Sequence, residues 1–166
     1  RERNFKVYLN NPSMRAALFA PVSAGDTALI GRLAESAVYS QWQHSRWSRN
    51  LRYARWRDGE VDIVSLDDLM KPEWAVELKW TDRPVRDPKE RAALKTFIAS
   101  NPTLTDCKLT SRTITGRITI DRLDVDVEPT AAYCYSVGRN IARTSHVFAS
   151  AARTALAEQP MLDLDG

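Results

Sequence analysis

The sequence predicts an α/β domain in which a long helix, three short strands, a second helix and further strands follow one another. Residues 28–47 carry apolar side chains at helical spacing, which predicts the long helix. Between residues 55 and 80, apolar and polar side chains alternate in three short runs, as they do in neighbouring strands. Strict alternation returns at residues 123–128. With 166 residues, of which 43% are hydrophobic, the chain is long enough to bury a core as one domain.

Proline, glycine and aspartate divide the first part of the chain into elements. A strand is expected over Phe5–Leu9, and Asn11-Pro12 predicts the start of a short helix that Pro21 ends. Gly25-Asp26-Thr27 introduces the long helix. Asp58-Gly59 predicts a hairpin with a type I′ turn, because both central positions of that turn need positive φ.

The second part of the chain repeats the change from helix to strand. Asp87-Pro88-Lys89-Glu90 is similar to a capping box and predicts a helix that runs to about Ser100. Three strands are then expected, and a short last strand and an amphipathic helix follow them. These elements are expected at residues 107–111, 117–120, 123–128, 133–135 and 139–158 respectively.

Two acids and a lysine are the strongest candidates for a functional site. In the alternating run from Trp74 to Trp80, Glu77 and Lys79 lie on one face, and Asp62 lies on the preceding strand. Adjacent antiparallel strands bring the three together on one side of a sheet, where two carboxylates form a site for a hard divalent cation. The alternative is that Glu77 and Lys79 form a solvated pair that serves solubility.

Basic residues are distributed unevenly, although the net charge is only +3. Five arginines lie between Arg46 and Arg57, interleaved with aromatic residues, and no acid occurs among them. Arginine beside aromatic rings suits contacts with phosphates and bases, which makes Arg52 and Arg55 candidate nucleic-acid ligands. Lys95 lies on one side of the second helix and is a further candidate. A solvated arginine-rich face is the alternative.

The cysteines, the apolar runs and the glycines indicate the cellular location and the ligands that we expect. Cys107 and Cys134 lie in apolar runs without metal-ligand spacing, so we interpret them as buried, reduced thiols of a cytoplasmic protein. No apolar run reaches membrane-spanning length and no signal peptide is seen, so no membrane partner is expected. Gly25 and Gly31 lack the Lys-Ser or Lys-Thr of a phosphate loop, so no ATP site is expected in this segment.

The order of elements and the position of four residues resemble a known superfamily. Glu35 on the long helix, Asp62 on the second strand and Glu77-Leu78-Lys79 on the third are similar to the signature of the PD-(D/E)xK phosphodiesterases. The proline of that signature is replaced by Val61. The resemblance implies the restriction-endonuclease-like fold, a three-layer α/β core of helix, three-strand meander, helix and strand around a mixed sheet, here with an added C-terminal helix.

A narrower resemblance rests on Lys6-Val7-Tyr8-Leu9-Asn10, on residues 14–18 and on Gly31–Tyr39. These segments resemble the domain of unknown function that follows an AAA-type ATPase module in many prokaryotic ATP-binding proteins. The resemblance implies an upstream ATPase module in the same polypeptide, with residues 1–24 leading in from it. Residues 25–135 then form the nuclease-like core, and residues 136–166 form a C-terminal helix and tail.

The superfamily implies a role for each matching residue. Asp62 and Glu77 would bind Mg²⁺ or Mn²⁺, Lys79 would act on the water or the phosphate, and Glu35 would be an auxiliary acid. Arg32 precedes Glu35 by one helical turn, so a local ion pair is the alternative for that acid. The flanking acids oppose the low pKa that Lys79 needs as a base, so we expect it to orient and to stabilise charge.

The expected function is metal-dependent hydrolysis of phosphodiester bonds in nucleic acid. The alternative is a catalytically inactive docking or regulatory module attached to the ATPase. An open acidic notch at the bottom of a basic groove would favour the nuclease. A closed cluster with Lys79 in an ion pair, away from any groove, would favour the docking module.

Overall fold

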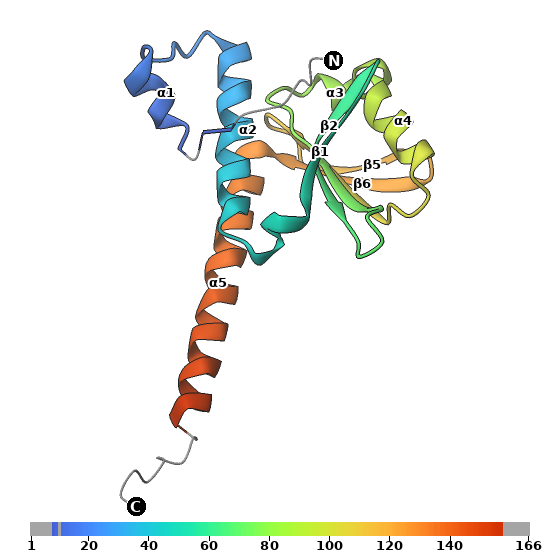
Figure 1. Cartoon of the computed structure of the whole chain (residues 1–166). Coiled ribbons are helices and arrows are strands. Elements are labelled where there is room, and N and C mark those ends of the chain that lie inside the picture. The colour runs from blue at the N-terminus through green and yellow to red at the C-terminus, as the bar shows by residue number, and fades with distance from the viewer. Residues whose placement is uncertain (1–7, 10, 158–166) are drawn as a thin grey trace, which may run out of the picture.

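A six-stranded mixed sheet forms the centre of the molecule (Figure 1). The computed structural model describes Tyr8, Leu9 and residues 11–157, and for residues 145–157 it describes the backbone alone. The strands are ordered β1-β2-β3-β4-β6-β5 across the sheet. Their bounds are β1 Leu51–Trp56, β2 Gly59–Leu66, β3 Pro72–Glu77, β4 Asp106–Ser111, β5 Gly116–Ile120 and β6 Leu123–Pro129.

The predicted α/β class is confirmed, with the meander and the crossover where they were expected. β1, β2 and β3 pair antiparallel in sequence order. β4 then pairs parallel with β3, and β6 pairs parallel with β4. A parallel neighbour requires a crossover connection, which here is the helical segment of residues 83–100.

Helices cover both faces of the sheet and bury a separate core on each. On one face, α2 (Thr27–Gln43) and α5 (Thr130–Ala157) lie against a cluster that includes Val38, Ile63 and Val76. On the other face, α4 (Ala92–Ser100) covers a larger cluster. The larger cluster includes Val61, Val64, Ala75, Leu94, Phe97, Ile98, Leu104 and Leu109.

The long helix begins where the sequence predicts and ends earlier. The side chain of Asp26 accepts a hydrogen bond from the backbone N–H of Leu29 at 2.9 Å, which caps α2. The predicted extension to Trp47 is wrong, because α2 ends at Gln43 and a 3₁₀ turn, η1 (Arg46–Asn50), follows. Ser45 caps this turn by accepting a hydrogen bond from the N–H of Trp47.

The predicted hairpin exists, but its turn differs. Trp56 pairs with Gly59, so the two loop residues are Arg57 and Asp58. The type I′ turn is wrong, because the described backbone has positive φ at no glycine and at neither loop residue. Gly59 is required for space instead: a Cβ there would lie 2.5 Å from the ring of Trp56 and 2.9 Å from Cβ of Ala93 on α4.

The other predicted elements are confirmed with small shifts. The short first helix is α1 (Ser13–Leu18), and the capping role of Asp87 is confirmed by its hydrogen bond from the N–H of Lys89. Two short elements, α3 (Arg83–Arg86) and η2 (Pro88–Arg91), precede α4. The strand expected at Phe5–Leu9 lies mostly outside the described residues, and Tyr8 and Leu9 belong to neither helix nor strand.

The end of the chain corrects one prediction. Residues 133–135 are not a strand, because α5 begins at Thr130, directly after β6. The predicted boundary between residues 135 and 136 therefore falls inside this helix. Figure 1 shows α5 packed beside α2 near the sheet and then continuing well beyond it. In the described part of the chain, no helix combines the length and the apolar character needed to cross a bilayer.

Candidate functional site

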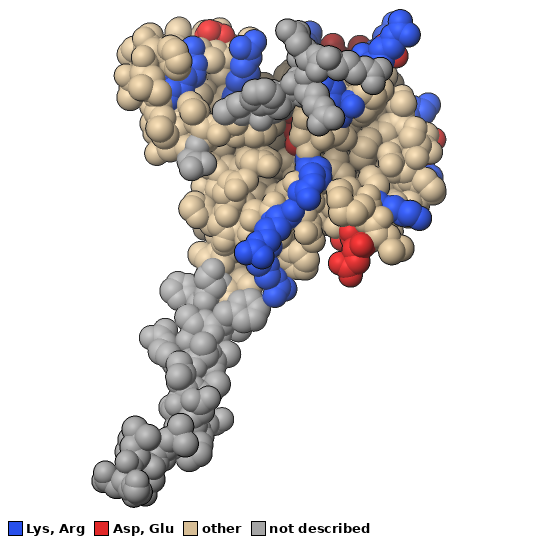
Figure 2. All heavy atoms as spheres, in the orientation of Figure 1, with Lys and Arg blue, Asp and Glu red and all other residues tan. Residues whose placement is uncertain are grey.

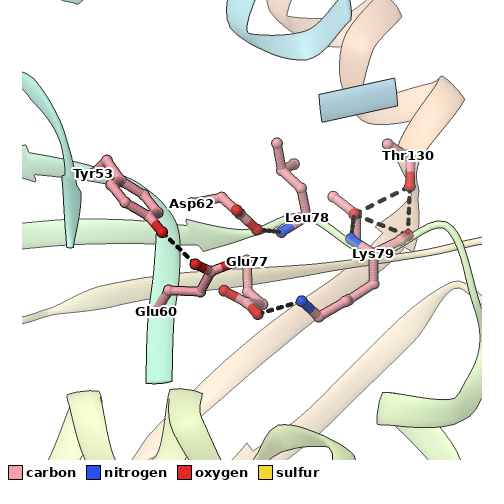
Figure 3. Close-up of polar contacts among 8 residues, drawn as sticks. Tyr53, Glu60, Asp62, Glu77, Leu78, Lys79 and Thr130 are labelled. Carbon is pink, nitrogen blue, oxygen red and sulfur yellow. Dashed lines mark hydrogen bonds and ion pairs between the residues drawn. The ribbon is translucent and has the colours of Figure 1, made fainter. Parts of the chain in front are cut away.

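The pairing of β2 with β3 brings Asp62 next to the end of β3. Ile63 pairs with Val76, so Asp62 lies beside Glu77 in the antiparallel register. The Asp62 side chain is 1% exposed, and its Oδ2 accepts a hydrogen bond from the backbone N–H of Leu78 at 2.9 Å (Figure 3). This bond fixes the carboxylate of Asp62 against the chain that carries the other two candidate residues.

Glu77 is the last residue of β3 and is 5% exposed. Its Oε1 lies 2.7 Å from Nζ of Lys79, whose side chain is about one-third exposed (Figure 3). Its Oε2 is buried and has no hydrogen-bond partner among the residues that the structure describes. Buried carboxylate oxygens normally have partners, so this oxygen is a position where a proton or a cation would be stabilised.

The electrostatic environment of Glu77 favours a neutral or metal-bound carboxyl. Burial raises the pKa of Glu77 to about 7, and the negative charge of Asp62 acts in the same direction. The ammonium of Lys79 lowers this pKa in part, while Glu60 raises it slightly. The site therefore contains two carboxyl groups and only one ammonium, so a further proton or cation would be stabilised there.

Lys79 remains an ammonium in this environment. Burial acts to lower the pKa of Lys79, but the carboxylates of Glu77, Asp62 and Glu35 outweigh it, so its pKa is raised. A raised pKa is unsuited to a general base and suited to a fixed positive charge. The charge of Glu35, on α2, also acts on Lys79, so the fourth predicted residue influences this site electrostatically.

Two buried threonines hold the backbone of Lys79 and were missed by the sequence analysis. The N–H of Lys79 donates to Oγ1 of Thr110 on β4 at 2.8 Å. Oγ1 of Thr130, the first residue of α5, donates to the carbonyl oxygen of Lys79 at 2.8 Å (Figure 3). The only signal in the sequence is a hydroxyl residue at the end of an apolar strand, which is too common to identify a site.

Glu60 and Tyr53 were also missed. The hydroxyl of Tyr53 on β1 donates a hydrogen bond to the carboxylate of Glu60 on β2. Figure 3 shows the Glu60 side chain next to that of Glu77. The spacing of Glu60 and Asp62, two residues apart on one strand, could have indicated a shared strand face.

The predicted nucleic-acid ligands are exposed but are not part of the acidic cluster. Arg52 donates to the backbone carbonyls of Arg49 and Leu51, and Arg55 and Lys95 are exposed on β1 and α4. Figure 2 shows Lys and Arg side chains in a continuous stretch over η1 and β1. The arginine-rich segment thus presents positive charge to solvent, and its strand β1 lies next to β2 in the sheet.

The acidic site is closed rather than open in this structure. A cavity of about 450 Å³ lies between α5, η1 and the sheet, and one of about 650 Å³ lies between α2 and α5; neither is lined by Asp62 or Glu77. Among the described residues, no group of three or more His, Cys, Asp or Glu side chains is arranged to hold a metal ion. Asp62 and Glu77, with the unpartnered Oε2, are the side chains that could contribute two ligands.

Both thiols are free, as predicted. Burial raises the pKa of Cys107 to about 12, which makes this thiol inert. The predicted burial is wrong for Cys134, which is only partly buried.

Comparisons of the chain with protein-family models, with curated proteins and with solved structures find no match. The residues and their geometry are therefore the basis for assigning a function.

Proposed function

We propose that this domain hydrolyses phosphodiester bonds of nucleic acid with the help of a divalent cation held by Asp62 and Glu77. The observation that carries the proposal is the buried, unpartnered Oε2 of Glu77 beside a second buried carboxylate. In a purely structural ion pair, both carboxylate oxygens would be expected to have partners, because an unsatisfied buried acceptor destabilises the fold.

The residues fit a divalent cation of the magnesium type. Mg²⁺ prefers oxygen ligands, keeps several waters and is commonly held by one or two carboxylates together with substrate phosphate. Asp62 supplies a buried carboxylate beside Glu77, and Glu77 offers its unpartnered Oε2. Bound there, such a cation would polarise a phosphate and lower the pKa of a water molecule.

The chain's own residues would orient the substrate and balance its charge. The ammonium of Lys79, held by the two threonines, would stabilise negative charge on a phosphate oxygen. Arginines of η1 and β1 would contact the phosphate backbone. The order of α2, the three-strand meander, α4 and β4 supports the restriction-endonuclease-like fold that we propose.

The closed geometry favours a second candidate, a catalytically inactive docking or regulatory module attached to an AAA-type ATPase. Lys79 is engaged with Glu77 at 2.7 Å, and neither carboxylate lines either of the two cavities. In this case the cluster would stabilise the end of β3 and would not meet a substrate.

Measurements of metal binding and then of cleavage distinguish the nuclease from the docking module. We would titrate the wild type, Asp62→Asn and Glu73→Gln with MgCl₂ and MnCl₂ by calorimetry. Glu73 is an exposed acid on the same strand as Glu77, so its variant is the matched control. The nuclease proposal requires binding that Asp62→Asn abolishes and Glu73→Gln preserves, together with Asp62-dependent cleavage of single- or double-stranded DNA or of RNA. Metal binding without cleavage of any of these substrates would support the docking module, and absence of binding would rule out the site.

A further inference from the structure

The second feature is a cavity on the face of the sheet opposite to α4. This cavity, of about 450 Å³, has the sheet as its floor, contributed by β3, β4 and β6. One wall is a stripe of α5 at helical spacing that runs from Tyr133 to Thr144, and the other is the end of α2 with η1. Its volume is within the range of small-molecule sites in proteins.

Aromatic rings held in place by other contacts line this cavity. The rings of Trp42 and Trp74 lie 5.3 Å apart between centroids at an interplanar angle of 32°. The indole N–H of Trp42 donates to the hydroxyl of Tyr133 at 3.2 Å. Trp47 also lines the cavity and is 47% exposed, so a ligand can reach part of its ring.

The charged side chains around the cavity balance one another. Lys108 and Glu128 form an ion pair on the floor at 2.9 Å, and Asp106 and Arg46 add one charge of each sign. A balanced lining does not favour a phosphate or a free carboxylate. It also does not favour an organic cation, because Arg46 already lies over the ring of Trp47 and Lys108 lies near that of Tyr133.

A flat neutral ligand with donors and acceptors at its edge fits such a lining. Asn140 on the α5 wall carries an amide that both donates and accepts, the combination that pairs with the edge of adenine. We propose that this cavity binds a purine base, stacked on tryptophan and paired at its edge with Asn140. The base comes either from a free nucleoside or from a single strand of nucleic acid.

The inference is independent of the proposed hydrolysis. Asp62, Glu77, Lys79 and Glu35 do not line this cavity. Trp74 and Val76 alternate along β3 with Glu77, so their side chains and that of Glu77 lie on opposite faces of that strand. Binding is therefore measured in EDTA, where failure of metal binding has no effect on the result.

The test is calorimetry of the wild type in EDTA with adenosine, with uridine and with an oligonucleotide of eight deoxyadenosines. Trp47→Ala and Asn140→Ala change exposed positions of the cavity, and Arg143→Ala changes an exposed residue of α5 that does not line it. Far-ultraviolet circular dichroism checks that all three variants fold.

We expect binding of a purine ligand that Trp47→Ala weakens about tenfold or more, since stacking on an aromatic ring contributes this much per base. Asn140→Ala should also weaken it about tenfold or more, because the paired contact with the edge of the base is lost. Arg143→Ala should leave the affinity within twofold. Binding of adenosine identifies the free nucleoside as sufficient, and binding of the oligonucleotide alone identifies the base of a strand. Absence of binding to both, equal affinity for uridine, or insensitivity to Trp47→Ala and Asn140→Ala would overturn the proposal.

Discussion

Nζ of Lys79 lies 2.7 Å from Oε1 of Glu77, while Oε2 of the same carboxylate is without a hydrogen-bond partner in the described part of the chain. The lysine thus satisfies one half of a buried acid that lies beside Asp62, and the other half is unsatisfied. This asymmetry leads to predictions about the lysine, about pH and about the residues that hold the pair.

Substitution of Lys79 should change cleavage of nucleic acid without changing metal affinity. If the domain cleaves nucleic acid, Lys79→Ala should lose most of the activity, because the charge that stabilises the phosphate is removed. Lys79→Arg should lose most of it as well, because the charge is kept but displaced. Metal affinity, measured by calorimetry, should stay close to that of the wild type in both variants. Full activity of Lys79→Ala would show that the Glu-Leu-Lys motif is a coincidence, and the docking module would then replace the nuclease.

The pKa of Glu77 predicts how stability depends on pH. Folding raises this pKa from 4.5 to about 7. Between these two pH values the carboxyl of Glu77 keeps its proton in the folded state and releases it in the unfolded state. The stabilisation is complete below pH 4.5 and is lost as pH rises through about 7. In EDTA, the Glu77 contribution to the free energy of unfolding should fall by up to about 3 kcal/mol across this range.

Urea unfolding of Glu77→Gln between pH 4.5 and 8.5 checks this dependence. The variant has no carboxyl to titrate, so its free energy of unfolding should decrease less with pH than that of the wild type. Glu73→Gln, at an exposed position of β3, should retain the wild-type dependence. Identical pH profiles for Glu77→Gln and the wild type would contradict the raised pKa.

Thr130→Val tests the link between α5 and the end of β3. The substitution keeps the shape of a side chain that is 2% exposed but removes the hydroxyl, whose single proton is shared between the carbonyls of Lys79 and Ser111. We expect the free energy of unfolding to fall by about 1–3 kcal/mol, because buried acceptors lose their donor. Thr115→Val, at an exposed position, should change it by less than about 0.5 kcal/mol. Equal stability of the two variants in urea unfolding would show that the link is dispensable.

Gly59→Ala tests the space between the hairpin and α4. The added methyl group would lie 2.5 Å from the Trp56 ring and 2.9 Å from Cβ of Ala93, so one of them must move. We expect a loss of about 1–3 kcal/mol in the free energy of unfolding. Gly116 is the matched control, because a Cβ there meets nothing within 4 Å. A thermal unfolding midpoint of Gly59→Ala equal to that of Gly116→Ala would show that the hairpin and α4 adapt freely.

Local features of the fold could be predicted because neighbouring residues decide them. The alternating side chains of β2 and β6 show their strand character, and Asp26 and Asp87 cap the segments that follow them. The Glu-x-Lys motif, which begins at the last residue of β3, and an acid on the preceding strand were sufficient to place Asp62, Glu77 and Lys79 at one site. These predictions use periods of two residues or single helix turns, which a sequence displays directly.

Features that depend on distant contacts could not be predicted in this way. Gly59 was interpreted as a turn residue, but its role is to leave room for Trp56 and α4. Tyr133–Tyr135 has apolar content that suits a strand, yet Tyr133 packs from α5 onto the core. In both cases the partner is decided by tertiary packing, which overrides the local preference.

The sequence by itself determined which charged residues meet, since β2 and β3 are consecutive strands and their register follows from a short connection. Only the tertiary structure decided the pKa of Glu77 and the hydrogen bonds that hold Lys79. Burial raises the pKa of Glu77, and Thr110 and Thr130, which lie 31 and 51 residues beyond Lys79, hold its backbone. Burial and such hydrogen bonds depend on how β4 and α5 pack against the end of β3, and no local pattern in the chain contains that information.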